Sequence, residues 1–397
     1  MSNKVPAIEL ESRMQRFRTQ MNQQHPQWEL SVVFNKINLY YFTGTMQEGM
    51  LFIPRNDEAV LWIKRSYERA VDESLFPRIR QMESYRDAAA ATKVFPDTVY
   101  IETEFIPVAF LQRFRKYFRF NEAASLDVEI GKARAVKSQY ELDLMKRSGE
   151  LHRLVLEDKV PAMLHEGMSE VDLAGELYTQ MLKDGHHGVA RFGMFDSEII
   201  IGHIAFGESS LYPTSFNGPG GNYGMGPAVP GVGSRERKLK KGDLVFLDVA
   251  FGVEGYHTDK TLNYIFGAYP DRELLREHII CLDIQARLSE QLKPGVIPAE
   301  LYENTISGLP PSFLNNFMGY GNRQVKFLGH GIGLYIDETP VIAKGFDLPF
   351  EENMVMALEP KKGIAGRGMV GIENTFIVTP EGGKCITGFS KGLIPVI

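Results

Sequence analysis

The chain has 397 residues, of which 44% are hydrophobic and 24% are charged. A chain of this length suggests two or three domains with large cores, which excludes intrinsic disorder, collagen and a disulfide scaffold. The 44 Lys and Arg residues against 50 Asp and Glu residues give a net charge of −6, and nothing in this balance favours nucleic acid or an anionic membrane as a partner.

The sequence shows no pattern typical of a membrane span or a secretion signal. The longest apolar stretches, such as 244–253, are interrupted by Asp or Gly and are shorter than the roughly 18 residues that a span needs. Residues 1–13 are charged and lack the apolar centre of a signal peptide. Cys281 and Cys385 are too few for a disulfide framework, so we expect a protein of the reducing cytoplasm.

The first third of the chain predicts a small α/β domain. A charged, amphipathic helix is expected at 8–21 and a second helix at 107–118. Short apolar runs separated by turn residues are strand candidates. These runs are Leu30–Phe34, Leu39–Phe42, Met50–Ile53, Val60–Ile63 and Thr98–Ile101. Helices between short strands indicate a mixed sheet with helical cover.

A charge-rich bridge at 126–139 separates this domain from the rest, and we place the boundary near residue 133. A long helix is expected to start after Ser138, because Glu141 lies three residues on and completes a capping box. Farther along, 167–173 resembles 295–301. Each segment follows one predicted helix and opens another, which suggests a duplicated helix–helix–strand unit in the larger domain.

Two glycine-rich segments do not fit nucleotide-binding motifs. Residues 216–234 are dense in Gly and Pro and are expected to be irregular, but they lack the spacing of a phosphate loop. Residues 329–333 have close glycines without the spacing of a dinucleotide loop. The longer segment either shapes a pocket or serves as a surface or dimer-contact loop.

Two aspartates lie inside apolar strands. Asp248 is in the predicted strand 241–251, and Asp259 is in the return strand after a turn at 252–255. A hairpin symmetric about Val253 and Glu254 would place the two aspartates directly opposite each other, with Cβ atoms roughly 4.5–5.5 Å apart. Bare carboxylates at that distance repel each other, so a cation between them is expected.

The last sixth of the chain repeats this pattern. Glu359 ends the predicted strand 354–360, and Glu373 lies in the middle of the predicted strand 369–378. His330 stands between glycines that allow close backbone approach. One such residue alone has a structural explanation, as an edge acid or a core histidine, but four strand-embedded acids together do not. The set suits two divalent ions, with Mn²⁺ favoured over Co²⁺, Zn²⁺ or Fe²⁺.

The same residues carry a family resemblance over essentially the whole chain. The sequence resembles the M24 metallopeptidases, which include Xaa-Pro dipeptidase (prolidase), Xaa-Pro aminopeptidase and creatinase. Asn38-Leu-Tyr-Tyr-Phe-Thr-Gly44 is similar to the family's N-terminal signature, and Ala133–Glu141 to its domain junction. The resemblance implies an α/β (α+β) chain. Residues 1–133 would form a creatinase-like α/β domain, and 134–397 a pita-bread catalytic domain with pseudo-twofold symmetry.

The resemblance also implies roles for the five residues. Asp248 and Asp259 would hold one metal ion, His330 and Glu359 the other, and Asp259 and Glu373 would bridge the pair. A bridging hydroxide would attack the N-terminal peptide bond of a short peptide, with Glu359 transferring protons beside His330. A cytoplasmic homodimer is the expected assembly.

The chain departs from the family where substrate-orienting groups are expected. Thr214 and Asp337 stand where the family has histidines, and Gly371 stands where it has an arginine. His203 and His257 are candidates to replace the missing histidines, although a structural role suits either. Thr214, Asp337, His203 and His257 are therefore the candidate substrate-binding residues.

Three functions remain open from the sequence. The first is a binuclear metallohydrolase acting on a peptide bond, with Xaa-Pro as the plausible substrate. The second is a metal-dependent hydrolase or lyase of the same fold acting on a small zwitterion; metal-free creatinase-like chemistry is disfavoured because its histidines are missing. The third is a non-catalytic binding relative, which is disfavoured because the ligand set is retained.

Overall fold

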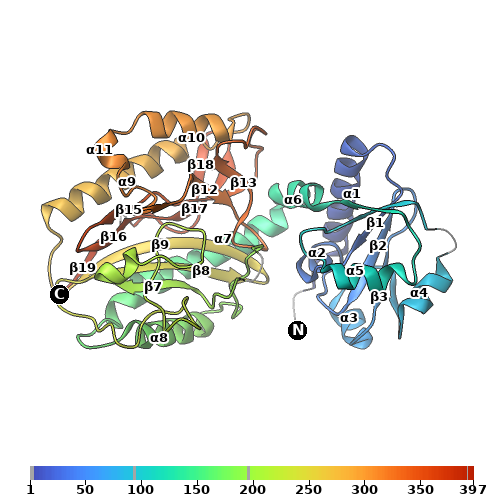
Figure 1. The fold of residues 1–397 in the computed structure, drawn as a ribbon, viewed down its shortest axis with the longest axis horizontal. Helices are drawn as coiled ribbons and strands as arrows, with labels where there is room; N and C mark the ends of the chain where they lie inside the picture. The colour runs from blue at the N-terminus through green and yellow to red at the C-terminus, as the bar shows by residue number, and fades with distance from the viewer. Residues whose placement is uncertain (1–3, 93–94, 195–196, 391) are drawn as a thin grey trace. The chain divides into compact units, whose positions relative to one another are not determined.

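The computed structural model describes residues 4–92, 95–194, 197–390 and 392–397. It is a mixed α/β structure (Figure 1) that divides into two compact units, Met1–Arg134 (unit 1) and Ala135–Ile397 (unit 2). Among the described residues, no helix is both long and apolar enough to cross a membrane.

Unit 1 is built on a six-stranded mixed sheet with the order β4-β3-β2-β1-β5-β6. Strand β1 pairs antiparallel with β2 and parallel with β5. Its elements are α1 (Ala7–Gln24), β1 (Leu30–Val33), α2 (Lys36–Thr43), β2 (Gly49–Pro54), β3 (Val60–Ile63), α3 (Tyr67–Glu73), β4 (Ile79–Gln81), α4 (Tyr85–Ala91), β5 (Thr98–Ile101), α5 (Val108–Arg115), β6 (Glu122–Ser125) and α6 (Asp127–Ala135). The mixed sheet with helical cover that the sequence predicts is confirmed.

One strand expected in unit 1 is wrong. Residues 39–42 lie in helix α2, because the Asn35 side chain accepts hydrogen bonds from the backbone N–H groups of Ile37 and Asn38, at 2.9 and 3.3 Å. Gly44, with φ 72°, ends the helix in the left-handed conformation. A short apolar run alone does not distinguish a buried helix from a strand, and here the caps decide.

Unit 2 holds two larger sheets, ordered β19-β9-β8-β7 and β13-β12-β14-β17-β18, and the pairs β15-β16 and β10-β11. Its helices are α7 (Gln139–Arg153), α8 (Glu170–Lys183), α9 (Arg272–Glu290), α10 (Pro298–Ser307) and α11 (Pro311–Leu314), with short π and 3₁₀ turns at Leu154–Lys159, Val160–Ala162 and Gly207–Leu211. Its strands are β7 (Gly202–Phe206), β8 (Leu244–Val253), β9 (Tyr256–Phe266), β10 (Gly319–Tyr320), β11 (Arg323–Gln324), β12 (Phe327–Gly331), β13 (Glu338–Ala343), β14 (Val355–Leu358), β15 (Lys361–Ile364), β16 (Gly368–Gly371), β17 (Asn374–Thr379), β18 (Gly382–Cys385) and β19 (Ile394–Val396).

The two halves of unit 2 repeat one plan. Helices α7 and α8 pack on the β7-β8-β9 side, and α9 and α10 pack on the β12-β14-β17 side (Figure 1). The capping box between Ser138 and Glu141 at the start of α7 is confirmed. The two similar segments of the sequence hold equivalent places, since Gly167 (φ 86°) and Gly295 (φ 92°) each lie three residues before a helix, α8 and α10.

The two sheets of unit 2 are joined beside their central strands. Thr261 of β9 and Glu373 form an isolated antiparallel bridge, with N–H···O distances of 3.2 and 3.4 Å. Thr261 belongs to the first half and Glu373 to the second. The bridge therefore brings polar side chains of both halves into one place, which is buried.

Candidate metal centre

The hairpin β8–β9 places Asp248 and Asp259 on one face of the sheet. The expected direct pairing of the two aspartates is wrong, because Asp248 pairs with Thr261 and Ala250 pairs with Asp259. The turn consists of Glu254 and Gly255, at φ 48° and 93°, which is a two-residue turn of the primed type. The register is thus shifted by two residues, and a shift of two keeps both carboxylates on the same face, as diagonal neighbours.

Glu359 and Glu373 lie opposite each other at a break between strands. The continuous strands expected through 354–360 and 369–378 are wrong: β14 ends at Leu358, β15 begins at Lys361, β16 ends at Gly371 and β17 begins at Asn374. Pro360 has no N–H to continue the ladder. The pairs Leu358 with Asn374 and Lys361 with Gly371 keep one register across the break, so the two glutamates face each other.

His330 lies on β12, paired with Ala357 of β14. Its Nδ1 is 3.0 Å from the carbonyl oxygen of Gly331, which favours a proton on Nδ1 and leaves Nε2 as the acceptor. That Nε2 is 3.6 Å from Oε1 of Glu359 and 3.7 Å from Oε1 of Glu373. The close backbone approach expected of the flanking glycines is confirmed, since a Cβ on Gly329 would lie 2.3 Å from the Ala357 carbonyl oxygen.

A lysine that sequence reasoning missed stands among these carboxylates. Lys361 Nζ is 2.9 Å from Oδ2 of Asp248, 3.0 Å from Oε2 of Glu359 and 2.7 Å from Oε2 of Glu373. The lysine is fully buried. Its signal in the sequence is the spacing Glu359-Pro360-Lys361, because side chains two apart on extended backbone lie on the same side.

The residues that remain fit a divalent cation. One ligand atom each from Asp259, His330 and Glu373 lie within 4.8 Å of one another. Oε2 of Glu373 accepts from Lys361 and from the hydroxyl of Thr261 (3.0 Å), whereas Oε1 is buried and, among the described residues, has no hydrogen-bond partner. An unpartnered carboxylate oxygen facing an imidazole nitrogen suits a cation bound between them.

Burial and mutual repulsion perturb the acids of the centre. Burial raises the pKa of Asp248 to about 6 and that of Glu359 to about 8. Burial, together with the charges of Glu373 and Asp248, also raises the pKa of Asp259. Burial acts in the same direction on Glu373, but the Lys361 ammonium and His330 hold the pKa of Glu373 well below its usual range. Burial acts to lower the pKa of His330, but the carboxylates of Asp337, Glu373 and Glu359 raise it overall, so without a metal ion the imidazole can serve as a second cation. A divalent ion at Nε2 would replace that proton and hold the carboxylates ionised.

Two of the four candidate substrate residues lie beside the centre. His203 of β7 pairs directly with Asp248, and Asp337 Oδ1 is 3.5 Å from His330 Nδ1. His203 Nδ1 is 3.0 Å from the Asn222 side-chain nitrogen, while its Nε2 is buried with no hydrogen bond from the described residues. Burial lowers the pKa of His203 to about 4, so the ring is neutral. The side chain of Asp337 is 32% exposed, which makes it the more open of the two.

The other two candidates have hydrogen-bond partners within the fold. The Thr214 hydroxyl accepts from the Phe216 backbone N–H at 3.2 Å, and its carbonyl accepts from the Arg323 guanidinium. The His257 ring contacts the Gly333 carbonyl through Nδ1 at 3.1 Å and His187 through Nε2 at 3.2 Å. These contacts favour a structural role for both residues.

The segment 216–234 has no helix or extended strand, as expected. It contributes Asn222 to His203, and the Phe216 ring lies 5.3 Å from the His203 ring. Of the two roles left open for this segment, these contacts favour the pocket-shaping one.

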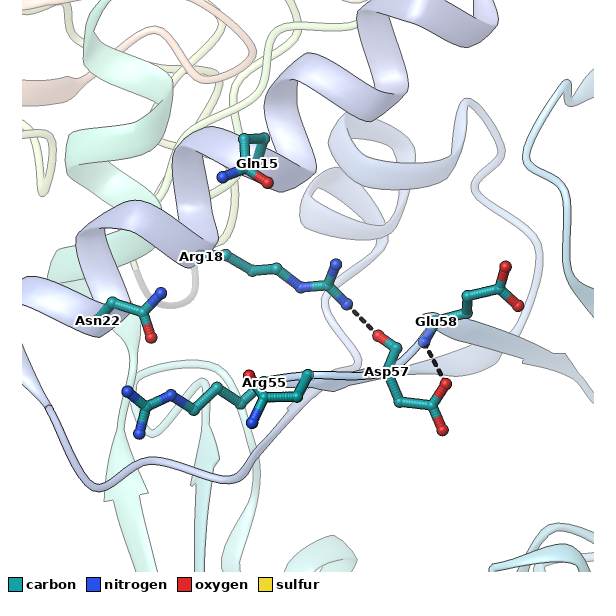
Figure 2. A pocket seen from close by; sticks show the side chains of 7 residues that line it. Gln15, Arg18, Asn22, Arg55, Asp57 and Glu58 are labelled. Atoms are coloured by element: carbon teal, nitrogen blue, oxygen red, sulfur yellow. Dashed lines mark hydrogen bonds between the residues drawn. The ribbon is translucent and has the colours of Figure 1, made fainter.

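A separate hollow of about 410 Å³ lies in unit 1, far along the sequence from these residues. Figure 2 shows Arg18 and Arg55 with Asp57 and Glu58 around it. The Arg18 guanidinium donates to the backbone carbonyls of Pro54 and Asp57, and Arg55 donates to that of Pro26. These guanidinium groups link loops of unit 1. The residues that line the hollow do not form a buried cluster of acids and histidine like the one in unit 2.

Two protein-family models match separate segments of the chain. The family described as metallopeptidase family M24 matches residues 143–380, and the creatinase/prolidase N-terminal domain matches residues 13–136. An Xaa-Pro dipeptidase of Pyrococcus furiosus is 26% identical over 362 residues, which cover 90% of this chain and 93% of the relative. An Xaa-Pro dipeptidase of Pyrococcus horikoshii is 25% identical, over 90% of this chain and 92% of the relative.

Solved structures show the same fold over nearly the whole chain. The prolidase of Pyrococcus horikoshii OT3 matches with a TM-score of 0.77 at 23% identity and covers 96% of this chain and 99% of its own. The prolidase of Pyrococcus furiosus matches with a TM-score of 0.75 at 25% identity and covers 94% and 99%. The M24 family model matches more than half of the chain, and the candidate metal-binding group lies within the matched region. This protein therefore belongs to metallopeptidase family M24.

Proposed function

We propose that this protein is a metal-dependent peptidase that cleaves the N-terminal peptide bond of short peptides, with Xaa-Pro peptides as the first substrate class. The observation that carries the proposal is the cluster of Asp259, His330 and Glu373, whose ligand atoms lie within 4.8 Å of one another, together with the buried Oε1 of Glu373, which has no hydrogen bond from the described residues. The names of the two Pyrococcus relatives, both Xaa-Pro dipeptidases, support the substrate class.

We assign Asp248, Asp259, His330, Glu359 and Glu373 to the metal centre, with Mn²⁺ as the first ion to test because the donors are mostly carboxylate oxygens. A divalent ion bound there would lower the pKa of a coordinated water and polarise the scissile carbonyl. Glu359 is the proton carrier in this assignment. It lies between the Lys361 ammonium and His330, at 3.0 and 3.6 Å, and both contacts fix its carboxylate.

The substrate side of the centre is assigned to Asp337 and His203. Asp337 is the partly exposed acid beside His330, so it is placed to pair with the α-ammonium of a peptide. The buried Nε2 of His203, next to Asp248, can donate to a substrate carbonyl, because the ring is neutral and its Nδ1 is engaged with Asn222. Glu359 and His330 remain the residues assigned to catalysis.

A second candidate is a hydrolase or lyase acting on a small zwitterion. The observation that favours it is the side chain at position 337, where a carboxylate would attract a cationic head group as well as a peptide N-terminus. The difference between the candidates lies in the bond that is broken. Product analysis therefore separates them: new amines and amino acids indicate a peptidase, and an alkene product indicates a lyase.

The test is a metal reconstitution followed by a substrate panel. The protein is stripped with a chelator, reloaded with Mn²⁺, Co²⁺, Zn²⁺ or Fe²⁺, and incubated with Xaa-Pro and Xaa-Ala dipeptides, tripeptides and small zwitterions. We expect Mn²⁺-dependent release of the N-terminal residue from Xaa-Pro peptides, which Glu359→Gln abolishes. A loaded protein that turns over none of them would instead support a non-catalytic binding role.

We further propose that residues 1–133 form the supporting N-terminal domain and 134–397 the catalytic domain, and that the protein works in the cytoplasm as a homodimer. The match of the creatinase/prolidase N-terminal family to residues 13–136 supports the division. Sedimentation equilibrium measures the assembly directly.

A further inference from the structure

The lysine at the centre is buried, and its backbone is fixed by contacts with neighbouring segments. Lys361 is fully buried, and its backbone carbonyl accepts the N–H of Met318 at 2.8 Å. Across the hairpin it pairs with Gly371, whose φ of 130° suits glycine. A Cβ at position 371 would lie 2.6 Å from Cα of Lys361, so the lysine backbone fills the space that a side chain at position 371 would need.

The ammonium has no donor left over. A lysine ammonium carries three N–H groups, and Lys361 Nζ lies 2.7–3.0 Å from three carboxylate oxygens, one each of Asp248, Glu359 and Glu373. These are the lengths of charge-assisted hydrogen bonds. Lys361 is thus a fixed monovalent cation built into the acid cluster.

Glu373 divides its oxygens between two cation positions. Its Oε2 accepts from Lys361 and Thr261, and its Oε1 faces the space bounded by His330 and Asp259. The first position is taken by a side chain of the chain itself. The second has a carboxylate on either side and an imidazole nitrogen, and its Glu373 oxygen is without a hydrogen bond from the described residues.

We propose that this centre binds one divalent ion, at Asp259, His330 and Glu373, and that the Lys361 ammonium takes the place of the second ion that the family resemblance implies. The inference rests on the proposed metal-dependent function. A second ion would need carboxylate oxygens of Asp248 and Glu359 at about 2.0–2.2 Å, and Lys361 already holds one oxygen of each. It would also lie within a few ångströms of a buried ammonium, where like charges repel strongly.

Lys361 acts in this scheme as a positioning residue. It keeps the carboxylates of Asp248 and Glu359 oriented toward the cation site without being a ligand. Its ammonium is also a permanent positive charge of the chain, whereas a second metal ion would exchange with solvent. Removal of the ammonium frees three oxygens in the arrangement that a second ion needs.

The test counts metal ions without reference to activity. Mn²⁺ bound to the chelator-stripped full chain is measured by elemental analysis after equilibrium dialysis, for wild type, Lys361→Met and Lys362→Met. We expect about one ion per chain in wild type and about two in Lys361→Met. Lys362 is the matched control because it is also buried but donates to the Phe313 and Asn315 carbonyls; its variant should bind about one ion, as wild type does.

A second measurement needs no variant. Electron paramagnetic resonance of Mn²⁺-saturated wild type should show the six-line signal of an isolated ion, whereas a coupled pair gives a multiline spectrum. Two ions per wild-type chain, a coupled spectrum, or no bound ion would overturn the proposal. One bound ion without turnover of any peptide would overturn the peptidase function and leave this inference standing. Two bound ions with cleavage of Xaa-Pro peptides would overturn this inference and leave the peptidase function standing.

Discussion

Glu102 in unit 1 and Glu359 in unit 2 both directly follow a strand, β5 and β14, and both glutamates are buried. Glu102 is surrounded by donors that the fold supplies: the backbone N–H groups of Phe34 (2.6 Å) and Asn35 (2.9 Å) and the Asn38 side chain (2.8 Å). Glu359 instead shares one ammonium with other carboxylates. A buried acid whose acceptors are matched by N–H donors stabilises the fold, whereas acids that outnumber their donors form a site for a cation.

The largest expected effect is on catalysis, when Glu359 is replaced and compared with the same replacement at Glu102. Glu359→Gln should lower kcat by about 10²–10⁴-fold, because it removes the group assigned to proton transfer. Glu102→Gln should leave kcat unchanged, since that carboxylate serves unit 1. Steady-state kinetics on Mn²⁺-loaded protein with an Xaa-Pro dipeptide measures both. Equal losses in the two variants would show that Glu359 acts through stability alone.

Removal of the unit 1 acid should act on stability instead. Glu102→Ala removes the carboxylate that accepts three N–H donors, one buried and two partly buried, and we expect the free energy of unfolding of unit 1 to fall by about 3 kcal/mol. Both tryptophans, Trp28 and Trp62, are buried in unit 1, so their fluorescence during urea unfolding reports on that unit.

Glu104→Ala is the matched control, because Glu104 is exposed two residues away. It should leave the tryptophan transition where it is in wild type. If Glu102→Ala shifted that transition no more than Glu104→Ala does, the three N–H contacts would not stabilise unit 1. Mn²⁺ binding in unit 2 should be the same in both variants.

The third effect is on metal affinity. Glu373→Gln replaces one of the two carboxylate oxygens with an amide nitrogen, and we expect Mn²⁺ to bind about 100-fold more weakly, or about 2.7 kcal/mol. Isothermal titration of the stripped protein measures the constant, and the rise in Tm on adding Mn²⁺ should shrink in parallel. An unchanged affinity would mean that Glu373 Oε1 does not contact the ion.

Local chemistry accounts for what the sequence predicts correctly. The Ser138–Glu141 capping box is complete within four residues, and the strand that carries Asp248 has an apolar run bounded by turn residues. The face shared by Asp248 and Asp259 also follows from alternation along the hairpin. Even with the wrong register, the sequence placed them on one face, because the error was two residues.

What the sequence misses depends on contacts between distant segments. The turn that sets the register needs a positive φ at Glu254, which is uncommon for that residue type. Lys361 follows Pro360 in a run of otherwise ordinary residues, and its burial becomes visible only when β15 pairs with β16 and their hairpin meets Asp248. Helix α2 was missed because its evidence lies in the caps and not in the apolar run.

The smallest expected effect concerns pH, where one buried group in each unit, Glu102 and His186, should respond in opposite directions. Burial raises the pKa of Glu102 to about 7, so its contribution to the stability of unit 1 is complete below about 4.5 and is lost as the pH rises through 7. Burial lowers the pKa of His186 in unit 2 to about 4, so its contribution is complete above about 6.5 and is lost as the pH falls through 4. Nδ1 of His186 accepts a hydrogen bond from the Gly252 N–H at 2.9 Å. Protonation of His186 would place a proton on Nδ1 and break this hydrogen bond.

Between pH 4.5 and 6.5, each group should therefore change the free energy of unfolding of its unit by about 1.4 kcal/mol per pH unit, downward for unit 1 and upward for unit 2 as the pH rises. Tryptophan fluorescence follows unit 1, and hydrogen exchange of amides in β8 and β9 follows unit 2. His186→Asn should flatten only the second trend and Glu102→Gln only the first. The test is the difference between wild type and variant in each unit: differences of the same sign for His186→Asn and Glu102→Gln would contradict the contrast, because an acid satisfied by neutral donors and a histidine held neutral by burial must respond to protons with opposite sign.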